Sequence, residues 1–243
     1  DGYLFQGNVT HPVPSSQKYQ FLKDKFGGQR RLYQHNGSIG NYFGDVSDSD
    51  EGVIKRITLS PRSSSTSYSV TGLYAPPGEV IKVEFSKADM EATGGLTFHI
   101  GQALYNAQCN NIWADKNQMQ RMPHLLTTLS ITKSTATLDE STNTYTGYIG
   151  SFIGGPIYIR NTKAVITVTI SGAVPHPHFI LGVTTPEIYE QNLKSSAPFF
   201  DLEVWDLGVL HSGPRRYSDP FTYDQIYAAA ILWDKVALVT TYH

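Results

Sequence analysis

Histidine spacing carries the most information about possible hydrolytic chemistry in this sequence. A helical zinc peptidase site needs two His four residues apart, with Glu after the first. None of the eight His is followed by Glu, and no two are four residues apart. The closest pair is His176-Pro177-His178, whose rings would face one side of an extended chain and could meet one metal ion. We favour the alternative, a rigid Pro-rich entry to a strand with solvated rings, because no third ligand is evident nearby.

Other catalytic signatures are also missing from the sequence. Cys109 is the single cysteine, which excludes an internal disulfide and a thiolate zinc cluster. Its neighbours match no catalytic cysteine motif, so we interpret it as an inert thiol. The sequence has no Gly-x-Ser-x-Gly elbow, and its acidic pairs lie in polar loops, where solvated charges are the simpler interpretation. We therefore name no catalytic residue and no metal ligand.

Aromatic residues make up 12% of the chain, and 15 of them are Tyr. Exposed Tyr and Trp can stack on sugar rings, although packing in the core is the more common role of any single one. We predict three surface contacts as binding candidates: Trp113 in a loop-like segment, and Tyr158 and Arg160 on a strand. The close pair His176 and His178 gives two further candidates.

Composition excludes several classes of function. The chain has 243 residues with 19 basic and 21 acidic side chains, so its net charge is −2. Nucleic-acid binders and polybasic membrane anchors rely on excess Lys and Arg, so this charge balance argues against both. No apolar run approaches the roughly 20 residues needed to span a bilayer.

Two glycosylation sequons, at Asn8 and Asn36, weakly favour a secretory route. We expect an extracellular or cell-surface protein.

Short runs of alternating apolar and polar residues, separated by Gly and Pro, predict β-strands. The alternation is clearest in 79–85, where Ile81, Val83 and Phe85 point one way. It recurs with Thr97 and His99 outside and opposite Phe98, and with Asp201 and Glu203 opposite Leu202. The predicted strands are 53–59, 79–85, 96–100, 125–132, 145–153, 156–160, 164–170, 179–183 and 200–204. Because no regular helices alternate with them, we predict a mainly β fold, an antiparallel jelly-roll-like sandwich.

Three helices are expected to interrupt or follow the strands. The first follows Ser15 or Ser16, and the second starts at Thr185 with Pro in its first turn. The third begins near Thr222, which has capping-box spacing to Gln225. Its apolar face would contain Ile226, Ala229, Ala230, Trp233 and Ala237. We divide the chain into an N-terminal extension with a short helix and first strands (1–65), a β-sandwich core (66–215) and a helical segment (216–243).

An ordered series of motifs goes beyond composition. It starts with Gly-Leu-Tyr-Ala-Pro-Pro-Gly-Glu at 72–79 and Gly-Leu-Thr-Phe-His-Ile-Gly at 95–101. It continues through 120–123, 154–159, 168–173, 184–189 and 197–199 and ends at 224–234. In order and spacing this series resembles the front half of the enhancin-like zinc metallopeptidases, which include mucin-degrading enzymes. The resemblance covers about residues 66 to 235.

This resemblance implies a β-sandwich packed against a helical catalytic half. In the family, the His-Glu-x-x-His helix that holds zinc lies downstream of the segment matching Trp233-Asp234, whereas the sequence stops at His243. No zinc ligand or general base of the family therefore has a matching position here. Pro156 and Tyr189 also stand where the family more often has an aliphatic residue and Trp.

Two functions follow as hypotheses from different classes. The first is the non-catalytic N-terminal scaffold of a secreted or surface zinc metallopeptidase acting on mucin-type glycoproteins, inactive as this chain alone. Its partner would be the catalytic half of the same protein, which would carry the zinc. The alternative is a stand-alone glycan- or protein-binding sandwich, lectin-like or a surface antigen, without enzymatic activity.

Overall fold

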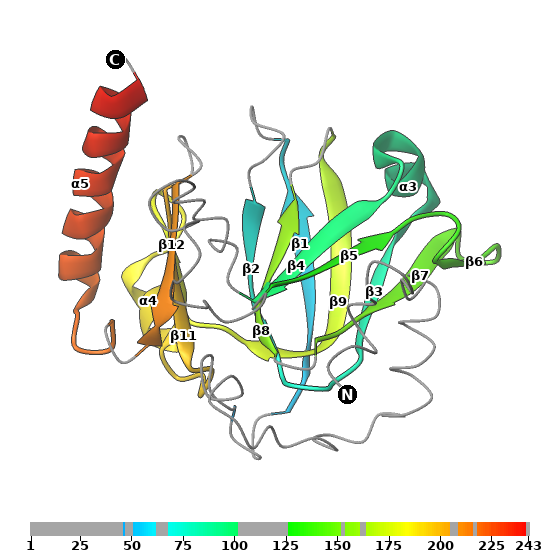
Figure 1. Ribbon diagram of the computed structural model, residues 1–243, viewed down its shortest axis with the longest axis horizontal. Helices are drawn as coiled ribbons and strands as arrows, with labels where there is room; N and C mark the ends of the chain where they lie inside the picture. The colour runs from blue at the N-terminus through cyan, green and yellow to red at the C-terminus, as the bar shows by residue number, and fades with distance from the viewer. Residues whose placement is uncertain are drawn as a thin grey trace, which may run out of the picture.

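Alternating sequences do form strands, and they assemble into one large and one small sheet (Figure 1). The computed structural model describes residues 46, 51–61, 68–101, 126–151, 154–160, 164–204, 209–215 and 218–241. The predicted helix after Ser15 or Ser16 lies outside these residues. Within them, the predicted mainly antiparallel β-sandwich with short helices and a C-terminal helix is confirmed. The jelly-roll-like winding stays a prediction.

The large sheet has nine strands and curls into two leaves. The first leaf contains β1 (Val53–Leu59), β9 (Ile166–Pro175), β3 (Ile81–Ser86), β7 (Thr144–Ile149) and β6 (Thr137–Asp139). The second leaf contains β2 (Tyr68–Ala75), β8 (Gly155–Arg160), β4 (Leu96–Gly101) and β5 (Leu126–Ile131). The end of β9 joins the leaves, because Pro175 pairs with Leu73 of β2. The expected boundary at residue 66 therefore falls inside this sheet, since β1 pairs with β9.

The main hydrophobic core lies between the two leaves. Every second residue of a strand faces inward, as Ile81, Val83 and Phe85 do in β3. Helix α3 (Lys87–Thr93), which follows β3, was not predicted. Ser86 caps it by accepting a hydrogen bond from the Asp89 amide, and Gly94 ends it in the left-handed conformation.

The small sheet contains β10 (His178–Ile180), β11 (Phe199–Val204) and β12 (Val209–Pro214), and we call it the C-terminal sheet. Helix α4 (Pro186–Asn192) connects β10 to β11, which explains why this pair is parallel, in contrast to the other pairings described. Thr185 caps α4 as predicted, since its hydroxyl accepts a hydrogen bond from the Ile188 amide at 3.3 Å.

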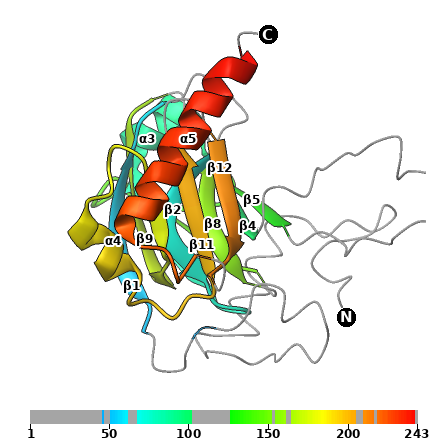
Figure 2. The same cartoon turned by 90° about the vertical axis from the view of Figure 1, so that its left-hand side faces the viewer.

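The C-terminal helix, α5 (Tyr223–Thr241), lies across the C-terminal sheet (Figure 2). The predicted capping box is confirmed, because the Thr222 amide donates to Gln225 and the Gln225 amide to Thr222. Of the predicted apolar face, Ile226 and Ala230 are buried against Phe200, Leu202 and Val204, whereas Trp233 remains 42% exposed. No helix among the described residues is long and apolar enough to cross a bilayer.

One expected strand orientation was wrong. His99 was predicted to point outward, but it is 5% exposed, and its ring lies against Tyr68, with the ring centroids 4.3 Å apart. Asp201 and Glu203 do alternate with the apolar residues of their strand as predicted, and they are 0% and 1% exposed. Strand β11 is buried on both faces: one packs on α5 and the other faces the second leaf.

Candidate functional site

Acidic residues inside a buried strand need partners, and β11 finds them on the second leaf. A charge removed from water is tolerated only where donors or opposite charges compensate it. The Tyr158 hydroxyl on β8 donates to Asp201 Oδ1 at 2.8 Å, and His176 Nε2 lies 2.8 Å from Asp201 Oδ2. The Val70 amide on β2 donates to Glu203 Oε2 at 3.2 Å. These contacts join the two sheets.

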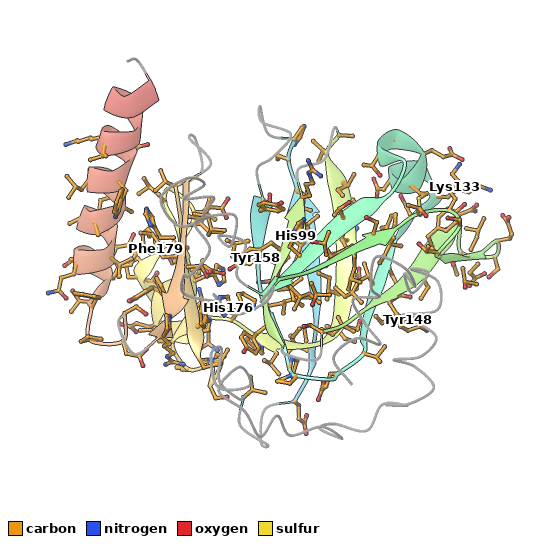
Figure 3. The ribbon with its side chains drawn as sticks, in the orientation of Figure 1. His99, Lys133, Tyr148, Tyr158, His176 and Phe179 are labelled. Atoms are coloured by element: carbon orange, nitrogen blue, oxygen red, sulfur yellow. The ribbon has the colours of Figure 1, made fainter. Side chains whose placement is uncertain are left out.

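We call this group the polar layer, and its members are Tyr158, His176, Asp201, Glu203 and Ser212. Ser212 on β12 contributes a hydroxyl 3.0 Å from the Tyr158 hydroxyl. Figure 3 shows Tyr158 and His176 where β8 meets the C-terminal sheet. Because Tyr158, His176 and Asp201 are each at most 1% exposed, the layer is interior.

Protonation keeps the Tyr158 hydroxyl a donor. Burial, and then the adjacent Asp201 carboxylate, raises the pKa of Tyr158 well above its usual value. The hydroxyl therefore stays protonated at any physiological pH. As Tyr158 sits on β8 and Asp201 on β11, this bond fixes the distance between the second leaf and the C-terminal sheet.

A bulge in β2 makes room beside the layer. The register of β2 with β8 shifts between Val70 and Tyr74, and Gly72 has φ +66°. The carbonyls exposed by the bulge accept hydrogen bonds: Thr71 from Lys55 Nζ at 2.8 Å, and Gly72 from the His176 amide at 3.0 Å. A Cβ at Gly72 would lie 2.5 Å from His178 Cε1, so only glycine fits.

His178 borders the layer as a neutral ring. Its Nδ1 lies 2.7 Å from the His176 carbonyl oxygen and therefore carries the proton. Burial, and then the positive charge of Lys55, lowers the pKa of His178 to about 4. Burial also lowers the pKa of Lys55. The predicted solvated rings of the His pair were therefore wrong: His176 is 1% exposed and His178 is partly buried.

Of the other predicted binding residues, Tyr158 joins His176 in the polar layer and Arg160 does not. Tyr158 is 0% exposed and cannot serve as a surface contact in this arrangement, whereas Arg160 on the same strand is exposed. Trp113 lies outside the described residues. Asp201, Glu203 and Ser212 were not predicted as site residues, although two acids within an otherwise apolar strand could have signalled a buried polar contact. Binding roles for the predicted residues stay predictions.

The polar layer does not fit a zinc site. Zinc needs three or four side chains converging on one point, and among the residues that the structure describes no three His, Cys, Asp or Glu side chains do so. Both oxygens of Asp201 already accept hydrogen bonds from protein groups. The layer also presents no exposed nucleophile. Its chemistry is that of a structural crosslink.

Comparison with known proteins identifies relatives of the sandwich. Residues 53–171 match the family described as the N-terminal domain of M60-like peptidases. Among curated proteins, none matches the sequence.

Two solved structures share the fold. The ZmpB metallopeptidase from Clostridium perfringens aligns with a TM-score of 0.53 at 16% identity, over 74% of this chain and 39% of that one. The M60 catalytic domain of Clostridium perfringens ZmpC, solved in complex with the sialyl T antigen, aligns with a TM-score of 0.52 at 15% identity, over 76% of this chain and 39% of that one. The chain thus spans well under half the length of either structure.

Proposed function

Residues 53–171 of this chain belong to the family of M60-like peptidase N-terminal domains, and on that premise we propose that the chain is the non-catalytic scaffold of a zinc metallopeptidase acting on mucin-type glycoproteins. Its role is to support a companion half that carries the zinc and the catalytic groups. The term companion half is used below for that part of the protein. Alone, the chain does not hydrolyse peptides.

Helix α5 carries this proposal. A helix that packs on one side only is normally polar on the other, and one that is apolar all round is normally buried. Helix α5 packs on the C-terminal sheet through Ile226 and Ala230, yet other apolar side chains of the same helix are largely exposed. Leu232 is 62% exposed, Trp233 42% and Val236 43%.

These three residues form the apolar stripe of α5. Val236 lies four residues after Leu232 and three after Trp233, so it is the neighbour of both on the helix surface. Contiguous exposed apolar surface usually marks a missing partner. Burying the stripe against a second body would bring α5 into the interior, and a helical catalytic half would provide such a body.

The proposed substrate rests on the fold relatives. ZmpC was solved with the sialyl T antigen, a glycan ligand, and it shares this chain's fold. We infer that the complete protein acts on a glycosylated polypeptide outside the cell. The zinc would be held by residues of the companion half, because the described residues provide no ligand set for it.

The gene that encodes the chain tests this proposal. We expect the complete gene product to contain a His-Glu-x-x-His segment after Trp233-Asp234 and to cleave a glycosylated mucin peptide in the presence of zinc. A version without residues 53–215 should lose this activity and aggregate, since it lacks its support. A gene product without a zinc-binding segment would overturn the proposal and would favour the stand-alone binding module.

A further inference from the structure

The two outer strands of the C-terminal sheet differ in how their free edges are satisfied. An edge strand exposes a row of unpaired amide and carbonyl groups, which natural proteins cover or block. On β10, local side chains and a turn occupy that row. Asn192 donates to the His178 carbonyl at 3.0 Å, and the Ile180 amide donates to the Thr184 hydroxyl at 2.8 Å.

On β12 the outward groups follow from the register. The Asp201 amide donates to Pro177 and the Glu203 carbonyl accepts from Leu181, so these two residues of β11 point toward β10. Their neighbours Phe200, Leu202 and Val204 must therefore point toward β12. The residues opposite these three are Gly213, His211 and Val209, which bond inward.

The alternate residues of β12, Leu210 and Ser212, consequently point their amides and carbonyls away from the sheet. Both residues are half-buried. Among the residues that the structure describes, their outward main-chain groups have no hydrogen-bond partner. The Ser212 side chain, in contrast, belongs to the polar layer. With respect to the described part of the chain, the outward edge of β12 is thus open, whereas that of β10 is blocked.

The open edge is continuous with the apolar stripe of α5. The ring of His211 on β12 contacts the ring of Trp233 in the stripe, with the centroids 4.2 Å apart and the planes tilted by 41°. His211 Nε2 is buried and has no hydrogen-bond partner among the described residues. Figure 2 shows α5 and β12 beside each other. A single partner lying along β12 would therefore also reach the stripe.

We propose that the companion half adds an extended strand to the open edge of β12 and covers the apolar stripe of α5 with the same element. Main-chain hydrogen bonds to Leu210 and Ser212 would supply the register, as in strand addition generally. Side chains facing α5 would have to be apolar to match Leu232, Trp233 and Val236. A permanent part of the protein fits this surface better than a transient ligand, because an open edge beside apolar surface otherwise favours aggregation.

This inference rests on the proposed function, and amide hydrogen exchange separates the two. In the chain alone, the amides of Leu210 and Ser212 should exchange rapidly, whereas those of His211 and Gly213 should be protected by β11. In the complete gene product, exchange at Leu210 and Ser212 should slow by at least about 100-fold, as expected when an amide enters a stable ladder.

The outcomes have distinct meanings. If the complete product carries a zinc-binding segment but Leu210 and Ser212 still exchange rapidly, strand addition is wrong and the proposed function stands. If the product has no zinc-binding segment, both the proposed function and the proposed strand addition are wrong. If the two amides are protected in the chain alone, in a manner that depends on protein concentration, a second copy is the occupant and the inference is overturned.

A proline variant tests the same edge without relying on exchange. Leu210→Pro removes one outward amide and no bond to β11, a position where edge strands tolerate proline. Leu210→Ala is the matched control, since it loses the side chain but keeps the amide. With the companion half supplied as a separate polypeptide, Leu210→Pro should bind it about tenfold more weakly than Leu210→Ala, the effect of about one hydrogen bond. Equal binding by two folded variants would contradict the inference.

Discussion

Removing the Asp201 carboxylate is the sharpest perturbation of the contact between the two sheets. Asp201 is 0% exposed and its two oxygens face the Tyr158 hydroxyl and His176 Nε2, each at 2.8 Å. Asp201→Ala leaves both groups buried without this acceptor, although Tyr158 keeps Ser212 at 3.0 Å. A buried group that loses its partner costs about 1–3 kcal/mol. We therefore expect a loss of about 3–5 kcal/mol, the range found when one partner of a buried pair is removed.

A series of variants separates packing from hydrogen bonding at this position. Asp201→Asn keeps one acceptor for Tyr158 and should lose only about 1–2 kcal/mol. Tyr158→Phe removes the donor and should cost a similar amount. The double variant Tyr158→Phe/Asp201→Ala should cost less than the sum of its single changes, because both changes break the same hydrogen bond. Glu190→Gln, an exposed carboxylate on α4, is the control for loss of charge. It should change stability by less than about 0.5 kcal/mol.

Urea unfolding followed by circular dichroism gives the free energy and its dependence on denaturant. A loss below about 1 kcal/mol for Asp201→Ala, or strict additivity of Tyr158→Phe with Asp201→Ala, would refute the assignment of the polar layer as a crosslink. If Asp201→Ala lowers the slope together with the midpoint, the two sheets have begun to unfold separately.

Three further predictions concern other parts of the fold. Gly72→Ala places a Cβ 2.5 Å from the His178 ring at a positive φ and should lower the melting temperature by several degrees, measured by calorimetry. Burial, and then the charge of Arg160, lowers the pKa of His99 to about 4, below the value of about 6.5 in the unfolded chain. The contribution of neutral His99 to stability is therefore present above about pH 6.5 and is lost as the pH falls from 6.5 to 4. Over that interval, His99→Gln should lose less stability than the wild type, measured by urea unfolding at each pH. Ile226→Ala should destabilise the chain by about 2–4 kcal/mol, whereas Leu232→Ala on the exposed side of α5 should cost under about 1 kcal/mol and reduce binding of a hydrophobic dye.

Much of the fold was predictable from local signals. The alternation of Ile81, Val83 and Phe85 identified β3, and the spacing of Thr222 and Gln225 identified the start of α5. These signals depend on neighbours within a few residues, so the sequence contains them directly.

Orientation toward a third layer was not predictable in the same way. Alternation assigns Asp201 and His99 to a face but does not say what covers that face. Asp201 became interior because Tyr158, from a strand more than 40 residues earlier, supplies a donor. The open edge of β12 likewise depends on which residues of β11 bond to β10, a property of register and not of residue type.

The location of the hydrolytic machinery is the central claim, and zinc content measured together with peptidase activity tests it most directly. The purified chain, incubated with zinc and then desalted, should retain no stoichiometric zinc and should leave a glycosylated mucin peptide intact, whereas the complete gene product should bind zinc and cleave it. Stoichiometric zinc and cleavage by the chain alone would contradict the account.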